Sequence, residues 1–207
     1  MGLLKGSSAY LIGSVDHHKN PNKWRKDITK DLLNPLGVNV YNPLMKPSWF
    51  QEEYPLVDNV HPSKDFELFK AVLNNRECKE FTDITPIENR MNAVRELCLR
   101  MANDCNFIIG FVPKKFTVGT WEEFGVAALS KKPILLYLPE GYDTSTWIPA
   151  QLNKSLNRFF EDSFTNIDDL YNRVKSIDSG DAKVNNLEWL FLSYFNNKDI
   201  KNELSIY

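Results

Sequence analysis

Short apolar runs recur along the chain and are separated by longer stretches that mix apolar and polar residues. Three runs read AYLIG, FIIGFV and PILLYL, and the last two are almost continuously apolar, as in strands covered on both faces. The pattern predicts four or five strands, the fifth a short edge strand: Ala9 to Gly13, Val38 to Tyr41, Phe107 to Val112, Pro133 to Leu138 and Arg158 to Phe160.

Apolar residues at helical spacing predict helices between these strands. The clearest covers Pro86 to Met101, whose apolar residues share one face. Leu44 to Pro62 has the character of a long loop, and such a loop inside a compact domain is usually functional. The other predicted helices are Pro21 to Leu33, Lys64 to Leu73, Thr120 to Leu129, Trp147 to Leu156, Asn166 to Ile177 and Leu187 to Phe195.

This alternation of strands and helices predicts one α/β domain over residues 1–207, with a flavodoxin-like three-layer sandwich. We expect a parallel sheet with the strand order 2-1-3-4-5, and a C-terminal helical extension over about residues 180–207. Ligands of such sheets bind beyond the carboxyl ends of the strands, near the switch between strands one and three. That rule selects Gly13 to Asp16, Asn42 and Pro113 to Glu123 as the candidate site.

Composition narrows the class of ligand. The net charge is -2 and the pI is near 6.0, so the chain lacks the basic excess that favours duplex nucleic acid or an anionic membrane. The three cysteines show neither an even count nor CxxC spacing, which disfavours a disulfide framework or a zinc site. We expect a cytoplasmic protein that acts on a small molecule, with Cys98 and Cys105 as small core residues.

Gly119 to Gly125 (GTWEEFG) is the most informative segment, because it follows a predicted central strand and opens a helix. One interpretation is a capping box, in which Thr120 caps the helix and Glu123 bonds back to the Thr120 amide. The other is catalysis. Gly119 would let the chain turn, and Gly125 with nearby alanines would let the helix pack closely on the sheet. Glu123 would then stand at the ligand-binding edge, where a carboxylate can attack an anomeric carbon.

Four segments of the chain resemble the nucleoside 2-deoxyribosyltransferase family. They are Tyr10 to Ser14, Phe107 to Val112, Gly119 to Gly125 and Lys132 to Leu135, in the family's order and spacing over residues 8–140. The resemblance implies a flavodoxin-like fold, cleavage of a deoxyribosyl–base bond and a glutamate nucleophile at Glu123. It also places Tyr10 where the family has a tyrosine that orients the nucleophile.

The chain departs from the family at residues that handle the base. Many members carry an aspartate six residues before the nucleophile, where this chain has Thr117. A second family aspartate aligns with Cys98. The acid that protonates the departing base therefore stays open among Asp16, Glu122 and Asp104.

Several polar residues allow two interpretations. The pair His17 and His18 can assist catalysis, although paired histidines in a polar loop more often stand in solvent. Arg25 can meet a phosphate, or be a solvated charge beside a core Trp24. Asn42 can bind a ribose hydroxyl or build an Asn-Pro turn.

Aromatic residues gather in two further segments. Trp49, Phe50 and Tyr54 can form a lid that stacks on a base, or can pack beneath their loop. The predicted last helix carries aromatics on more than one face, which indicates core or a subunit interface: Trp189, Phe191, Tyr194 and Phe195. This apolar surface and the family resemblance lead us to expect a homo-oligomer, at least a dimer.

Together these observations predict an enzyme: a nucleoside or nucleotide 2-deoxyribosyltransferase with a covalent deoxyribosyl-Glu intermediate, no metal and no other cofactor. A free base would be its second substrate. The alternatives are a hydrolase of nucleoside monophosphates or NAD, favoured by phosphate donors near Ser14, Arg25 or the Thr120 helix, and a non-catalytic nucleotide-binding module. The predicted catalytic residues are Glu123 and Tyr10, and the predicted substrate-binding residues are Gly13, Ser14, Asp16, Asn42, Thr117, Gly119 and Thr120.

Overall fold

A single parallel sheet forms the centre of the structure, a computed structural model that describes residues 2–13, 20–53, 85–111, 118–138, 162–184 and 188–192. Its five strands have the order β2-β1-β3-β4-β5, and every neighbouring pair is parallel. The strands are β1 (Ser8–Gly13), β2 (Asn39–Tyr41), β3 (Phe107–Phe111), β4 (Ile134–Tyr137) and β5 (Asp162–Phe164). This is the flavodoxin-like order, so the predicted fold class is confirmed.

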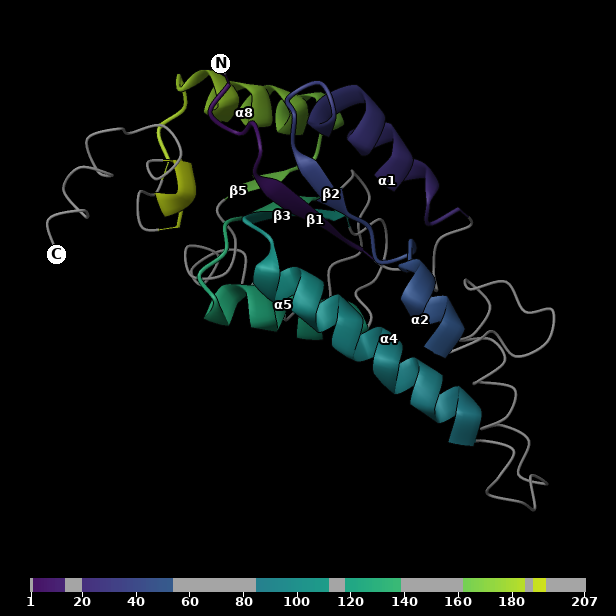
Figure 1. The fold of residues 1–207 in the computed structure, drawn as a ribbon. Helices are drawn as coiled ribbons and strands as arrows, with labels where there is room; N and C mark the ends of the chain where they lie inside the picture. The colour runs from purple at the N-terminus through teal and green to yellow at the C-terminus, as the bar shows by residue number, and fades with distance from the viewer. Residues whose placement is uncertain are drawn as a thin grey trace, which may run out of the picture.

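Helices cover both faces of the sheet, which gives three layers (Figure 1). One face carries α1 (Lys23–Ile28), the π-helix η1 (Thr29–Leu33) and α8 (Ile167–Ser179). The other face carries α4 (Thr85–Asp104) and α5 (Val118–Leu129). The short helix α2 (Ser48–Glu53) follows β2 within the stretch that was predicted to be a long loop.

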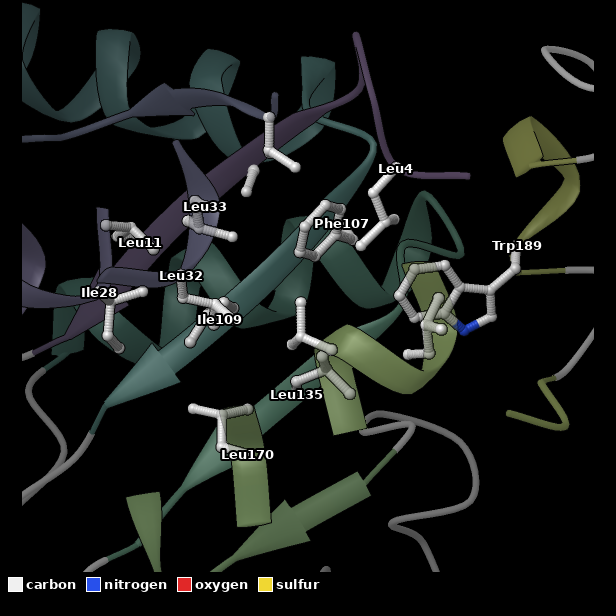
Figure 2. Packing of buried hydrophobic residues seen from close by; sticks show 14 of the residues in the cluster. Leu4, Leu11, Ile28, Leu32, Leu33, Phe107, Ile109, Leu135, Leu170 and Trp189 are labelled. Atoms are coloured by element: carbon white, nitrogen blue, oxygen red, sulfur yellow. The ribbon is translucent and has the colours of Figure 1, made fainter. Parts of the chain in front are cut away.

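Alternate residues of the central strands fill two separate cores. Figure 2 shows the first core, in which Leu11 and Ile109 meet side chains of α1, η1 and α8. In the second core, Tyr10 and Ile108 meet Phe124 of α5. Because side chains on both faces of β1, β3 and β4 are buried, these strands read as apolar runs without alternation. The alternation of side chains along β1 also places Tyr10 on the face of the sheet that α4 and α5 cover.

Capping residues set both ends of α8, the helix whose bounds were predicted accurately. The Asn166 side chain accepts a hydrogen bond from the Asp168 amide at 2.8 Å and caps α8. Gly180 ends the same helix in the left-handed region, with φ of 82°. The helix predicted from Pro21 to Leu33 instead divides into α1 and η1, where the Asn34 amide bonds to the Thr29 carbonyl five residues back.

Three other predicted elements lie wholly outside the described residues. These are the helices at 64–73 and 147–156 and the edge strand at 158–160, while the fifth strand of the sheet is β5. None of the described helices is long and apolar enough to cross a membrane.

Trp189 belongs to the first core. It is 1% exposed, and its ring lies 5.7 Å from Phe107 and 5.5 Å from Phe191, measured between centroids. Tyr194 and Phe195 lie outside the described residues. Part of the aromatic surface on which an oligomer was predicted is therefore used within the chain itself, and the oligomer stays a prediction.

Gly110 of β3 allows α5 to pack closely on the sheet. A Cβ at this position would lie 2.6 Å from Cζ of Phe124 and 3.0 Å from Cδ1 of Leu136. A Cβ at Gly125 would meet nothing within 4 Å, so the sequence-based assignment of close packing to Gly125 is wrong. The strand, rather than the helix, provides the space that brings the two elements together.

We predict that Gly110→Ala destabilises the protein by about 1–3 kcal/mol, because the added methyl group overpacks a contact with the buried Phe124 ring. The free energy of unfolding, obtained from urea denaturation, measures the effect.

Gly125→Ala is the matched control, since it adds the same methyl group to an open position of α5. Helix propensity alone should then stabilise this variant by up to about 1 kcal/mol. Equal losses of stability in the two variants would contradict the assignment of the close contact to Gly110.

Candidate active site

The two predicted catalytic residues meet between the sheet and α5. Tyr10 of β1 is fully buried, and its hydroxyl donates a hydrogen bond to Oε1 of Glu123 at 3.0 Å. Glu123 stands on α5, the helix that follows β3. The contact joins residues 113 positions apart in the chain, so it depends on the order of the strands.

An ion pair between α4 and α5 shows which glutamate faces α4 and which faces Tyr10. Arg95 of α4 binds the Glu122 carboxylate through Nε and Nη2, with Nε 2.8 Å from Oε2. Since successive residues of a helix point about 100° apart, this register turns Glu123 towards the sheet. Ser130 donates to Asn103 at 2.7 Å with the same 27-residue offset, so the two helices run parallel.

Two candidates for the acid that protonates the base lie away from Glu123. Glu122 is held by Arg95 on the side of α5 that faces α4. Asp104 ends α4 just before β3 begins, which places it at the opposite edge of the sheet from the carboxyl ends. The structure therefore excludes Glu122 and Asp104 as the acid that protonates the base. The third candidate, Asp16, lies outside the described residues.

The capping-box interpretation of this helix is wrong. α5 begins at Val118, so Thr120 is a buried residue inside the first turn instead of the cap. Gly119 also lies inside the helix and has no positive φ, so it makes no tight turn. The Glu123 carboxyl meets Tyr10, and the local Thr-x-x-Glu pattern does not define its role.

Burial raises the pKa of Glu123 to about 7, although part of the residue surface remains accessible. The Tyr10 hydrogen bond, the positive charges of Arg25 and Lys46, and a hydrogen bond from Cys98 all act in the opposite direction and lower it. Burial, reinforced by the negative charge of Glu123, raises the pKa of Tyr10 well above its usual range. Tyr10 therefore stays a donor, while Glu123 is substantially ionised at neutral pH.

Cys98 is buried, as predicted, and it also contacts this site. The thiol of this α4 residue lies 3.7 Å from Nζ of Lys46, and it lowers the pKa of Glu123 and raises that of Tyr10. Burial raises the pKa of the thiol, so it keeps its proton. One sequence signal points to this position, because Cys98 aligns with a family aspartate. Cys105 is fully buried in the second core, as predicted.

Arg25 is fully buried, so neither predicted role, a phosphate ligand or a solvated charge, fits its position. Its three nitrogens donate to three backbone carbonyls: Nε to Leu11 at 3.2 Å, Nη1 to Pro21 at 2.6 Å and Nη2 to Gly13 at 2.8 Å. Its guanidinium carbon lies 4.5 Å from the Trp24 ring centroid. Burial lowers its pKa to about 10, so the group remains charged at neutral pH. The residue fixes the carboxyl end of β1.

Gly13 allows close packing at the same carboxyl end of β1. A Cβ there would lie 2.5 Å from the Phe111 carbonyl oxygen and 2.8 Å from the Trp24 ring. Only glycine leaves room for this approach while its own carbonyl accepts from Arg25. Direct binding of substrate by Gly13 stays a prediction. Ser14 and Thr117 lie outside the described residues.

The turn after β2 brings Lys46 back to the site. The Asn42 side chain accepts from the Leu44 amide at 3.0 Å, and the Asn42 carbonyl accepts from the Met45 amide at 2.9 Å. This Asn-Pro turn confirms the second of the two interpretations of Asn42. Nζ of Lys46 then donates to the Pro43 carbonyl and to Cys98. Lys46 was not predicted as a site residue, because a lysine in a predicted loop has no distinguishing pattern.

Two of the three aromatic residues that were predicted to form a lid or to pack beneath their loop lie in the described residues. Phe50 is 1% exposed and packs beneath, with the Arg90 guanidinium over its ring, whereas Trp49 is 52% exposed. Tyr54, His17 and His18 lie outside the described residues. Within the described ranges, no group of three or more His, Cys, Asp or Glu side chains could hold a metal ion.

Comparison with known proteins gives matches only among solved structures. No family model matches the chain, and no curated protein matches it. The CMP N-glycosidase BcmB of Clostridium botulinum is similar with 15% identity and a TM-score of 0.44, over 81% of this chain and 97% of that chain. A conserved protein of Enterococcus faecalis V583 has 10% identity and a TM-score of 0.45, over 82% and 98%. Similarity at this level carries no conclusion about activity.

We predict that Arg25→Met destabilises the protein by at least about 2 kcal/mol, because buried carbonyl oxygens lose their charged donors. Arg25→Lys should lose less stability than Arg25→Met, since an ammonium can reach some of these carbonyl oxygens. Denaturation in urea gives both values. Arg100→Met, at an exposed position of α4, is the control and should change stability by no more than about 0.5 kcal/mol.

We also predict that Glu123→Gln stabilises the protein at alkaline pH. The folded-state pKa of about 7 lies above the ordinary 4.5, so the folded protein binds more protons than the unfolded chain between these values. Wild-type stability should therefore fall as the pH rises from 4.5 to 7, by at most about 3 kcal/mol. The uncharged glutamine avoids this loss.

The difference in unfolding free energy between Glu123→Gln and the wild type should be small below pH 4.5, rise between pH 4.5 and 7, and stay constant above. Denaturation curves at half-unit steps of pH measure it. The control Glu122→Gln removes the neighbouring carboxylate, which pairs with Arg95 of α4, and should show no such rise. A difference that does not change with pH would refute the buried, ionisable character of Glu123.

Proposed function

We propose that this chain cleaves the N-glycosidic bond of a deoxynucleoside or deoxynucleotide through a covalent deoxyribosyl-Glu123 intermediate. Transfer of the sugar to a second free base makes it a 2-deoxyribosyltransferase, and transfer to water makes it a hydrolase. The observation that carries the proposal is the Glu123 carboxyl held by the Tyr10 hydroxyl at 3.0 Å. The sequence resemblance to nucleoside 2-deoxyribosyltransferases supports the same assignment.

The environment of Glu123 suits a nucleophile. A carboxylate with a pKa of about 7 is more basic than an ordinary glutamate, yet a large fraction of it is ionised at neutral pH. The hydrogen bond from Tyr10 fixes the orientation of the carboxyl group. Both features match a group that forms a bond to carbon and later has to release it.

In the first step, a Glu123 oxygen attacks C1′ and the electron pair of the C1′–N bond moves to the base. The transition state resembles an oxocarbenium ion, which the adjacent negative carboxylate stabilises. In the second step, a second base or water attacks C1′ from the opposite side, and the electron pair of the ester bond returns to Glu123. Two inversions give net retention at C1′.

The alternative of a nucleoside monophosphate or NAD hydrolase loses one of its supports. Arg25 was a candidate phosphate donor, but each of its nitrogens already donates to a backbone carbonyl and the residue is fully buried. The perturbed pKa of Glu123 favours chemistry over the non-catalytic binding module, because such shifts cluster at functional sites.

Glu123→Gln should remove turnover of a deoxynucleoside with or without a free base, while the variant stays folded. Chromatography of the products separates the activities: exchange of bases indicates a transferase, and release of base alone indicates a hydrolase. A 2-fluoro-2-deoxy nucleoside should trap the sugar on the wild-type protein, because fluorine disfavours the oxocarbenium-like transition state of both steps. Peptide mass mapping should locate the adduct on Glu123.

Glu122→Gln is the matched control, one residue away on the same helix and bound to Arg95. It should retain turnover and label at Glu123. An adduct on Glu122 or Asp16, or substantial turnover by Glu123→Gln, would show that the nucleophile is assigned wrongly.

A further inference from the structure

The site lacks an assigned proton donor for the departing base, since two predicted carboxylates lie elsewhere. Four side chains that carry a proton act on the pKa of Glu123: Tyr10, Arg25, Lys46 and Cys98. A general acid has to reach an acceptor atom of the substrate while it still holds a proton. The contacts of the four groups decide which of them can do so.

Three of the four are already committed to other contacts. The Tyr10 hydroxyl donates to Glu123 itself. Each Arg25 nitrogen donates to a carbonyl of the protein, and the whole side chain is buried. The Cys98 thiol is buried, and its sulfur lies 3.7 Å from Nζ of Lys46.

Lys46 differs from these three in two ways. The residue is partly exposed, so a substrate can reach it. Its ammonium has three N–H donors, and two acceptors face it: the Pro43 carbonyl and the Cys98 sulfur. No carboxylate of the described segments lies within ion-pair distance of Nζ, so one donor remains for a ligand.

The position of Lys46 relative to Glu123 also fits. The turn at Asn42 returns the chain from the carboxyl end of β2, and Nζ reaches Cys98 at 3.7 Å. The positive charge of Lys46 also lowers the pKa of Glu123, so the ammonium lies near the carboxyl group. A retaining mechanism likewise needs its two groups a few ångströms apart.

We propose that Lys46 is the general acid that protonates the departing base, and the general base of the second step. The inference rests on the proposed function. In the first step, the C1′–N electron pair moves to the base and the ammonium transfers one proton to a ring nitrogen or exocyclic oxygen of the base. Lys46 becomes a neutral amine. In the second step, the amine takes a proton from the attacking water or base, and the electron pair of the Glu123 ester returns to the carboxylate.

Substrates with different leaving groups test the proposal. A nucleobase needs a proton to depart, whereas 4-nitrophenolate, from a 4-nitrophenyl 2-deoxyribofuranoside, does not. Lys46→Met should lower kcat/KM for a deoxynucleoside by about 10²–10⁴-fold and for the nitrophenyl compound by less than about tenfold. With the nitrophenyl compound, kcat should also fall and a burst of nitrophenolate should appear, because hydrolysis of the intermediate lacks its base.

Two further variants separate proton transfer from charge and from folding. Lys46→Arg keeps the positive charge and the donors but gives up its proton far less readily, so it should show the same leaving-group pattern. Lys23→Met removes an exposed lysine that pairs with Asp27 on α1, and it should leave both substrates unaffected. Denaturation midpoints show that each variant is folded.

Equal losses on both substrates, or no loss on either, would overturn the assignment of Lys46. So would Asp16→Asn if that variant, instead of Lys46→Met, showed the leaving-group pattern. A wild-type protein that cleaves neither substrate and forms no adduct on Glu123 would refute the proposed function itself. A wild-type protein that forms the adduct while Lys46→Met behaves normally would refute only the role of Lys46.

Discussion

The structure depends on one constraint: the carboxyl group of Glu123, on α5, is held against an apolar sheet. Glu123 gains a hydrogen bond from Tyr10, but that bond does not replace the water it loses, and its pKa stays near 7. Above that pH the folded protein therefore holds a charge that opposes folding. Two apolar cores, one on each face of the sheet, supply the stability that makes this arrangement possible.

A second buried charge complements the first. Arg25 satisfies its hydrogen bonds with carbonyl groups, which are neutral, and has no carboxylate within ion-pair distance among the residues that the structure describes. Carbonyl dipoles satisfy the donors but leave the net positive charge in place. That charge acts on Glu123 and favours its ionised form. The residue that fixes the end of β1 thus also adjusts the electrostatics of the site.

The sequence pattern predicts the framework of this protein better than its site. Apolar runs located the strands because side chains on both strand faces are buried, and the resemblance paired Tyr10 with Glu123. Arg25 could not be predicted in its actual role, since a charged residue near a helix start is normally solvated and its carbonyl partners lie at the end of another element. Cys98 shared an apolar helix face, and its polar neighbours come from β1, α5 and the turn after β2.

The capping-box interpretation of Thr120 and Glu123 was wrong for a related reason. A Thr-x-x-Glu pattern describes four residues, whereas the start of α5 at Val118 puts Thr120 inside the first turn. Local patterns of this kind identify the helix but cannot say which way Glu123 points. That direction follows from the packing of α5 on the sheet, where Gly110 leaves space for Phe124.

The strand order explains why these groups converge. β1 lies between β2 and β3, so the turn after β2 and the helix after β3 approach the end of β1 from its two sides. The chain that leaves β1 continues into α1, which covers the opposite face of the sheet. The face that α4 and α5 cover therefore receives the turn after β2 and the helix after β3. Each element then contributes a different chemical property: α1 a fixed buried charge, α5 a basic carboxylate and the β2 turn a reachable ammonium. A change of strand order would leave every local element intact and still separate these three groups, so the arrangement of the site is a property of the topology.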